Sequence, residues 1–228
     1  MSAGTVKRLT IEVDEARRVS ALFQRPRAAT ACFVFAHGAG AGMEHASMTA
    51  IAAELASRRI ATLRFQFPYM ERGSKRPDAP SICHATVRAA VAEAARRVPK
   101  LRLFAGGRSF GGRMTSQAQA IEPLPGVSGL AFLGFPLHAA GKPSVERAEH
   151  LREIKIPMLF LQGTRDELAT LALLKPLMKR LGARVTLKLL KDADHSFHVP
   201  ARGGRKDPEV RAEMLDALAA WIEQTKPR

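Results

Sequence analysis

The chain contains only two cysteines in 228 residues, Cys32 and Cys83, and they are far apart in the sequence. Two cysteines are too few for a disulfide framework, and neither sits in the Cys and His spacing of a structural metal site. Cys32 lies within the apolar stretch 31–36, which predicts a buried thiol. The sequence therefore excludes the classes of small protein that are stabilised by disulfide bonds or by a structural zinc ion.

Long apolar stretches are also missing, and none approaches the ~20 residues that a membrane-spanning helix needs. Residues 1–18 contain acids and lack the apolar core of a signal peptide, so the sequence predicts a cytoplasmic protein. The glycine patterns of dinucleotide and phosphate-binding loops are missing, as are His and Asp clusters with metal-ligand spacing. We therefore expect no cofactor and no metal.

Acidic residues are scarce: 21 against 36 lysines and arginines, which gives a formal net charge of +15. Such a balance can indicate a nucleic-acid partner, but the basic pairs are scattered, as at Arg17-Arg18, Arg58-Arg59 and Arg96-Arg97. No basic run is interleaved with aromatic residues. We expect a small-molecule substrate and no nucleic acid, while the oligomeric state stays open.

Apolar residues make up 46% of the chain and charged residues 25%, which is typical of a globular protein. The length suits one domain over residues 1–228, and neither a repeat nor a linker interrupts it. Residues 5–13 and 17–24 alternate polar and apolar positions, which predicts an antiparallel pair at a sheet edge. After Pro26, strand-like and helix-like segments alternate.

The alternation predicts an α/β fold whose sheet is mostly parallel, with helices on both faces and an antiparallel N-terminal edge. The expected parallel strands are 31–36, 60–65, 101–105, 127–135, 156–161 and 185–190. The expected helices are 47–58, 82–98 with Ser81 as N-cap, 113–120, 144–152, 168–181 with a kink or break at Pro176, and 207–224. Ligands of such folds bind beyond the carboxyl ends of the strands.

A serine between glycines lies at one of these strand ends, in the stretch LRLFAGGRSFGGR. Ser109 is flanked by Gly107 and Gly111, with a strand before and a helix after it. This is the pattern of a nucleophile elbow. The turn is so sharp that the residues two positions before and two positions after the serine must be small. The pattern alone is short enough to arise by chance. The assignment therefore also requires a base, an acid and an oxyanion hole elsewhere in the chain.

A serine nucleophile needs a base and a carboxylate that orients the base, in the chain order Ser, acid, His. Asp166 follows the strand 156–161, whereas the end of the preceding strand carries no carboxylate. The loop after the last strand carries His195, which we expect to be the base, with His198 as a rival. Asp194 is too close to His195 to orient it and is expected to form an Asx turn.

The oxyanion hole should combine the N–H after the nucleophile, from Phe110, with one from the loop after the strand 31–36. That loop reads His37-Gly38-Ala39-Gly40, and Ala39 is favoured over Gly40 as the donor. His37 is expected to brace the loop. Gly40, Tyr69, Arg108 and His138 also follow strands and are candidate substrate contacts.

Together, FVFAHGAGAG, GGRSFGG, GTRDEL and DADHSF resemble the small single-domain α/β-hydrolases of the dienelactone-hydrolase-like group. FPYMERGSKRPD and GFPLHAAGKP resemble more narrowly the group that contains testis-expressed protein 30 and the third subunit of the nuclear NSL chromatin complex. The resemblance implies Ser109, Asp166 and His195 as a catalytic triad. Dienelactone hydrolases themselves have a cysteine nucleophile, so a dienelactone substrate does not carry over.

The sequence thus predicts a serine hydrolase of the α/β-hydrolase fold that cleaves a carboxylic ester or related acyl substrate through an acyl-enzyme on Ser109. About twenty residues separate Phe135 from Ile156, too few for a large cap. Two alternatives stay open: an interaction protein that keeps the fold with little or no catalysis, and a thioesterase or acyltransferase that uses the same triad.

Overall fold

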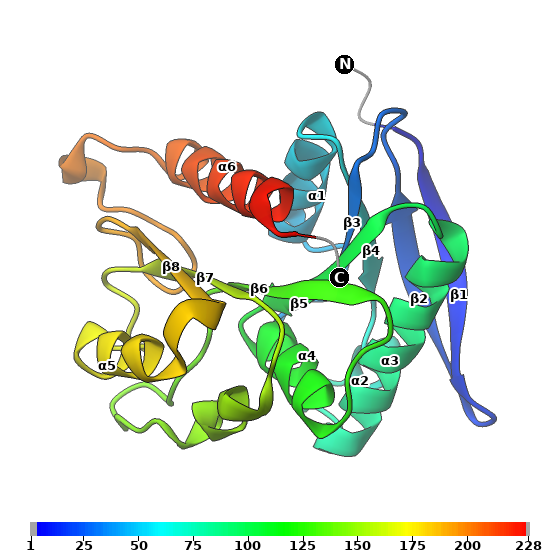
Figure 1. Cartoon of the computed structure of the whole chain (residues 1–228), viewed down its shortest axis with the longest axis horizontal. Coiled ribbons are helices and arrows are strands. Elements are labelled where there is room, and N and C mark those ends of the chain that lie inside the picture. The colour runs from blue at the N-terminus through cyan, green and yellow to red at the C-terminus, as the bar shows by residue number, and fades with distance from the viewer. Residues whose placement is uncertain (1–3, 227–228) are drawn as a thin grey trace.

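The computed structural model describes residues 4–226 and contains one sheet of eight strands (Figure 1). The strands are β1 (Val6–Asp14), β2 (Arg17–Gln24), β3 (Ala31–Ala36), β4 (Ile60–Phe65), β5 (Arg102–Arg108), β6 (Val127–Leu133), β7 (Met158–Gly163) and β8 (Val185–Leu190). Their order across the sheet is β1-β2-β4-β3-β5-β6-β7-β8. The pairs β1–β2 and β2–β4 are antiparallel, and all other neighbours are parallel.

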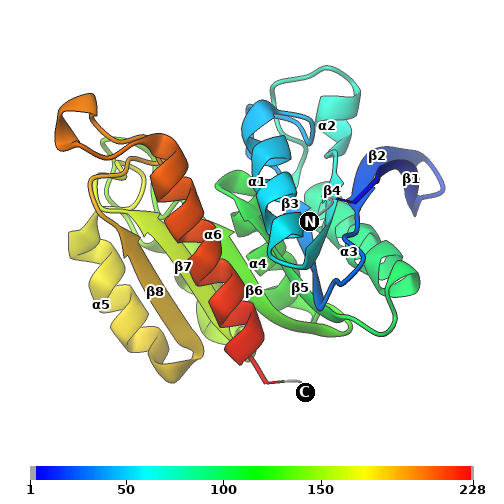
Figure 2. The ribbon, with the colours of Figure 1, turned by 90° about the horizontal axis from the view of Figure 1, so that it is seen from above.

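Helices cover both faces of this sheet (Figure 2). They are α1 (Ala46–Ser57), α2 (Pro68–Glu71), α3 (Pro80–Arg97), α4 (Phe110–Ile121), α5 (Leu171–Leu181) and α6 (Asp207–Gln224), with 3-10 segments at Glu146–Glu153, Gly182–Arg184 and Ala201–Gly203. Helices α1 and α6 pack on one face, and α3, α4 and α5 pack on the other. The predicted fold class is therefore confirmed.

Burial explains the continuous apolar runs of the central strands. Every residue of β3, β4, β6 and β7 is buried, because each of these strands has helices on both sides. The edge strand β1 instead alternates, and Ile11 is its buried residue. Cys32 is buried as expected, and the burial raises the pKa of its thiol to about 12.

Several predicted elements differ from the structure in their bounds or in their type. Helix α3 begins at Pro80 rather than near Ile82, because the fixed φ of proline suits the first helical position, and Ala79 rather than Ser81 is its N-cap. Strand β5 continues to Arg108, so almost no loop separates it from Ser109. The segment expected to be a helix over 144–152 is the 3-10 segment Glu146–Glu153.

Two further helical features differ in detail from the prediction. The short helix α2 lies between the expected strand 60–65 and the expected helix 82–98, where no helix was predicted, and Pro68 occupies its start. Helix α5 begins at Leu171 rather than 168 and runs through Pro176 without a break. The ranges of β4, β8 and α6 match the prediction.

The topology leaves the carboxyl ends of the parallel strands open on one edge. Between β6 and β7 the chain forms only a loop and the 3-10 segment Glu146–Glu153, so it carries no large cap within residues 4–226. The segments that follow β3, β5, β7 and β8 all begin at this edge. In the part of the chain described, no helix combines the length and the apolar character needed to cross a bilayer.

Candidate active site

Ser109 occupies the junction between β5 and α4 with backbone angles φ 48° and ψ −116°. A residue with a Cβ rarely adopts this conformation, and it persists only where the surroundings enforce it. The Ser109 N–H donates to the Leu133 carbonyl at 3.1 Å, which ties the turn to β6. The turn therefore projects the serine side chain beyond the strand ends.

Neighbouring backbone packs against the residues two positions before and two positions after the serine so closely that only glycine fits there. A Cβ at Gly107 would lie 2.6 Å from the Ala36 carbonyl oxygen, and one at Gly111 would lie 2.5 Å from the His37 carbonyl oxygen. Both distances are shorter than real Cβ contacts, so any side chain at either position would push α4 away from β3.

His195 lies between Ser109 and Asp166. Its Nε2 is 2.8 Å from the Ser109 Oγ, and its Nδ1 is 2.8 Å from the Asp166 Oδ2. The three residues come from the ends of β5, β7 and β8, and only the fold brings them together. The structure thus places the expected nucleophile, base and acid in one line of hydrogen-bonding groups.

The Asp166 side chain is fully buried, and three donors surround it. Its Oδ1 accepts from the Leu168 N–H at 2.8 Å, while its Oδ2 accepts from Gln162 Nε2 and faces His195 Nδ1. Gln162 also accepts from the Phe135 N–H at 2.9 Å through its Oε1. Both oxygens of this buried carboxyl group therefore have hydrogen-bond partners, as burial of a polar group requires.

Gln162 was not anticipated from the sequence. It is a polar residue inside the apolar strand β7 and is completely buried. A buried amide needs hydrogen-bond partners. A glutamine in an apolar strand, four residues before the candidate acid, could therefore have indicated a partner for that acid.

The loop that carries His195 is shaped by Asp194. The Asp194 Oδ1 accepts from the backbone N–H groups of Ser196 at 2.7 Å and His198 at 2.9 Å, so the predicted Asx turn is present. The imidazole of His198 turns away and bonds Asp207. This bond lowers the pKa of the Asp207 carboxyl. Of the two histidines, His195 is the one beside Ser109.

The two segments that are expected to supply the oxyanion donors both adjoin Ser109. Phe110 is the first residue of α4, and the first N–H groups of an α-helix have no acceptor inside the helix. Gly38 abuts the nucleophile, since a Cβ added there would lie 4.0 Å from the Ser109 Cβ, and Ala39 follows it. The glycine loop therefore reaches Ser109 from the side of β3.

His37 and Tyr69 hold this glycine loop. His37 Nε2 accepts from the Phe67 N–H at 3.0 Å, and its Nδ1 is 2.7 Å from the Gly38 carbonyl oxygen. Tyr69 donates its O–H to the Ala39 carbonyl at 2.9 Å and is fully buried, which raises the pKa of its phenol. His37 thus braces the loop as predicted, and the same hydrogen bonding gives Tyr69 a structural role.

The other candidate contacts occupy different places. Arg108 donates to the Ser47 Oγ at 2.7 Å and to the Ser196 carbonyl at 3.5 Å, and burial lowers the pKa of its guanidinium. His138 is buried, its Nδ1 2.9 Å from the Ala139 carbonyl oxygen and its Nε2 accepting from the Thr170 N–H. Gly40 is exposed on the glycine loop. A substrate contact for these residues stays a prediction.

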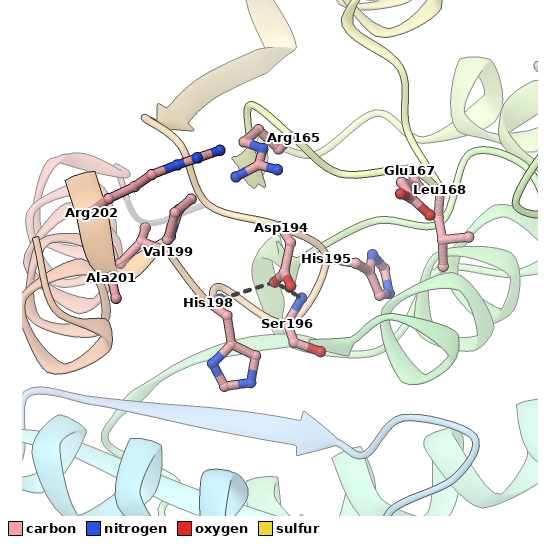
Figure 3. Close-up of a pocket in the computed structure, with 11 residues that line it drawn as sticks. Arg165, Glu167, Leu168, Asp194, His195, Ser196, His198, Val199, Ala201 and Arg202 are labelled. Carbon is pink, nitrogen blue, oxygen red and sulfur yellow. Dashed lines mark hydrogen bonds between the residues drawn. The ribbon is translucent and has the colours of Figure 1, made fainter.

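A cavity of about 820 Å³ adjoins His195 (Figure 3). Its walls come from the loop after β7 and the long loop after β8. The lining residues are Arg165, Glu167, Leu168, Asp194, His195, Ser196, His198, Val199, Pro200, Ala201 and Arg202. Within residues 4–226, no three His, Cys, Asp or Glu side chains are grouped so that they could hold a metal ion.

The chain belongs to the alpha/beta hydrolase domain family, whose model matches residues 29–223. A dienelactone hydrolase from Anabaena variabilis is 19% identical over 100% of both chains, with a TM-score of 0.80. An alpha-beta serine hydrolase homologue from Coxiella burnetii is 19% identical over 93% of this chain and 97% of its own, with a TM-score of 0.75. A serine hydrolase without lid from Xanthomonas campestris is 20% identical over 97% of each chain, with a TM-score of 0.74. At these identities the likeness establishes the fold.

Burial of His37 predicts a pH-dependent stability. Burial lowers the pKa of His37 to about 4, from 6.5, so the folded protein holds this imidazole neutral while the unfolded chain binds a proton below 6.5. The stabilisation is therefore present above pH 6.5 and lost as pH falls toward 4. Between pH 7 and pH 5, His37 should remove about 2 kcal/mol from the free energy of unfolding.

Urea unfolding of the wild type and of His37→Gln, followed by circular dichroism at pH 7, 6 and 5, measures this contribution. The variant should be less stable at pH 7 and lose less free energy of unfolding on acidification. Equal pH slopes for the two proteins would contradict the assignment of a neutral, buried His37.

Proposed function

We propose that this protein is a serine hydrolase that cleaves a carboxylic ester or related acyl substrate through an acyl-enzyme on Ser109. The observation that carries the proposal is the continuous line from Ser109 Oγ to His195 Nε2 and from His195 Nδ1 to Asp166 Oδ2, with 2.8 Å at each step. Membership of the alpha/beta hydrolase family and the strained turn at Ser109 support it.

In the first half of the reaction, Ser109 Oγ attacks the carbonyl carbon while His195 Nε2 takes the hydroxyl proton. Asp166 accepts from His195 Nδ1–H, which fixes the tautomer and stabilises the imidazolium that forms. The carbonyl oxygen becomes negatively charged and is held by the N–H groups of Phe110 and Ala39, at the positive end of the α4 dipole. His195 then returns the proton to the leaving alcohol oxygen, and the acyl group stays on Ser109.

In the second half, water takes the place of the alcohol. His195 Nε2 removes a proton from the water, the resulting hydroxide attacks the acyl carbon, and the bond to Ser109 Oγ breaks as His195 returns the proton to that oxygen. The products are the carboxylic acid and the restored serine. Every catalytic group in the cycle belongs to this chain.

The acceptor distinguishes hydrolysis from the alternative acyl transfer, and the leaving group distinguishes ester from thioester cleavage, because the triad would serve all three reactions. A comparison of acyl-CoA with simple esters as substrates separates them. The grouping with testis-expressed protein 30 and the NSL complex subunit, the cytoplasmic location and the single-domain organisation stay predictions. The alternative of an interaction protein with little or no catalysis would be indicated if the following experiment detected neither labelling nor hydrolysis.

The substitution Ser109→Ala should abolish covalent labelling by a fluorophosphonate probe, since it removes the nucleophilic oxygen. Peptide mapping of the labelled wild type should place the adduct on the peptide containing Ser109, and p-nitrophenyl acetate hydrolysis should fall at least ~1000-fold. Ser116→Ala, at a buried serine on α4 that faces His150, is the matched control and should keep labelling. Equal labelling of wild type and Ser109→Ala would refute the assignment of the nucleophile.

The substitution Gln162→Glu tests the support of the acid. An acceptor oxygen remains for the Phe135 N–H, but the amide donor to Asp166 becomes a carboxyl group. When protonated, this group still donates to Asp166, whereas its ionised form repels Asp166. We expect the kcat of the variant to rise and then fall with pH, while that of the wild type rises to a plateau.

Gln162→Met, which removes both hydrogen bonds at every pH, is the control and should be slow throughout. Circular dichroism of each variant separates lost folding from lost activity. Parallel pH profiles for Gln162→Glu and the wild type would show that Gln162 does not act on the triad.

A further inference from the structure

Arg64 is a charged residue inside the buried strand β4 and is only 2% exposed. Its Nη1 donates to the Met43 carbonyl at 3.0 Å and to the Thr49 Oγ1 at 2.9 Å. Within residues 4–226 no carboxylate forms an ion pair with it, and Glu44, whose charge acts on it from farther away, pairs with Arg8 at 2.5 Å. A buried charge without an opposite charge lowers stability, so the contacts of this guanidinium indicate why an arginine lies here.

Gln66 follows Arg64 by two residues and contacts the same loop residue. Gln66 Oε1 accepts from the Met43 N–H at 2.8 Å, while Arg64 donates to the Met43 carbonyl. The backbone of Gly42 packs directly on the Gln66 amide, since a Cβ at Gly42 would lie 2.8 Å from Gln66 Oε1. Both polar backbone groups of Met43 are therefore fixed to the end of β4.

Met43 ends the segment 38–43, which carries the expected oxyanion donor Ala39. His37 holds the beginning of this segment, and Tyr69 holds the Ala39 carbonyl. The segment consists of glycine and alanine up to the buried Met43. Such residues have little or no side chain to pack, so the position of their backbone depends on where the segment is held. Without the contacts at Met43, the Ala39 N–H would be held from one side only.

We propose that Arg64 and Gln66 are positioning residues for the reaction, which fix Met43 and through it the Ala39 N–H where the carbonyl oxygen becomes negatively charged. The inference rests on the proposed hydrolase function and on Ala39 as a donor of the oxyanion hole. In this role neither side chain needs to touch the substrate. The charge on the oxygen develops only in the transition state, so a displaced donor should lower kcat and leave KM unchanged.

Gln66→Met and Gln66→Glu are a matched pair of variants. Glutamate keeps an oxygen acceptor for the Met43 N–H, whereas methionine has a similar length and only a weakly accepting sulfur. Loss of a whole oxyanion donor lowers kcat roughly 100- to 1000-fold, so a donor that is only loosened should cost about 10- to 100-fold. We expect this loss in p-nitrophenyl acetate hydrolysis by Gln66→Met, and a kcat close to that of the wild type for Gln66→Glu.

Arg64→Met and Thr49→Ala separate the two hydrogen bonds of Arg64. Arg64→Met removes the bond to the Met43 carbonyl together with the bond to Thr49, whereas Thr49→Ala leaves the bond to Met43 in place. Arg64→Met should therefore lose as much kcat as Gln66→Met, and Thr49→Ala should behave as the wild type. A wild-type kcat in both Arg64→Met and Gln66→Met would overturn the proposal.

The course of fluorophosphonate labelling separates positioning from a merely structural role. A structural role would lower the fraction of folded enzyme, and with it the final extent of labelling. A positioning role instead lowers the rate constant, because the phosphonyl oxygen gains negative charge as the bond to Ser109 forms. We expect slow but complete labelling of Arg64→Met and Gln66→Met. Labelling at the wild-type rate that stops short of completion would show a structural role and refute the proposal.

An NMR measurement keeps this test separate from that of the proposed function. The backbone order parameters of Ala39 and Gly40 should fall in Arg64→Met and Gln66→Met, and should keep their wild-type values in Gln66→Glu and Thr49→Ala. A wild type that is neither labelled nor active would refute the hydrolase function, and the order parameters would then decide whether Arg64 and Gln66 hold the segment. Unchanged order parameters and chemical shifts of Ala39 in Arg64→Met and Gln66→Met would show that they do not.

Discussion

The backbone of Ser109, at φ 48° and ψ −116°, is the constraint on which the site depends. A conformation this unfavourable must be enforced by its neighbours, and here β3, β5, β6 and α4 all contribute. Gly107 and Gly111 let α4 approach β3, and the Ser109 N–H is fixed to β6. The sharp turn has two consequences. It presents the serine side chain above the strand ends, and it directs the first N–H groups of α4 toward that side chain.

The remaining groups are held by hydrogen bonds that reach beyond the three central residues. Gln162 links Asp166 to the backbone at Phe135, and Tyr69 and His37 hold the glycine loop. These supporting groups are buried, so their hydrogen bonds are made in a low dielectric and are costly to break. A site supported in this way keeps its geometry without a substrate, which is what preorganised stabilisation of a developing charge requires.

Sequence reasoning reached the fold class and the grouping of Ser109, Asp166 and His195 at one edge, because strand ends and chain order determine both. It did not reach Gln162 or the hydrogen bond of Tyr69 to Ala39, because both depend on which side chains meet across distant loops. The start of α3 was missed because proline at the first helical turn outweighed the capping preference of Ser81. Local patterns thus identified the elements that carry chemistry, and tertiary packing decided which polar groups support them.

The central claim is that the turn at Ser109 brings the nucleophile, His195 and two backbone N–H groups around one reacting carbonyl. A crystal structure of the protein after reaction with a fluorophosphonate tests this most directly, because the bound phosphonyl group imitates the tetrahedral intermediate. The account predicts phosphorus bonded to Ser109 Oγ and a phosphonyl oxygen about 2.7–3.1 Å from the N atoms of both Phe110 and Ala39. An adduct on another residue, or a phosphonyl oxygen turned away from both N–H groups, would contradict it.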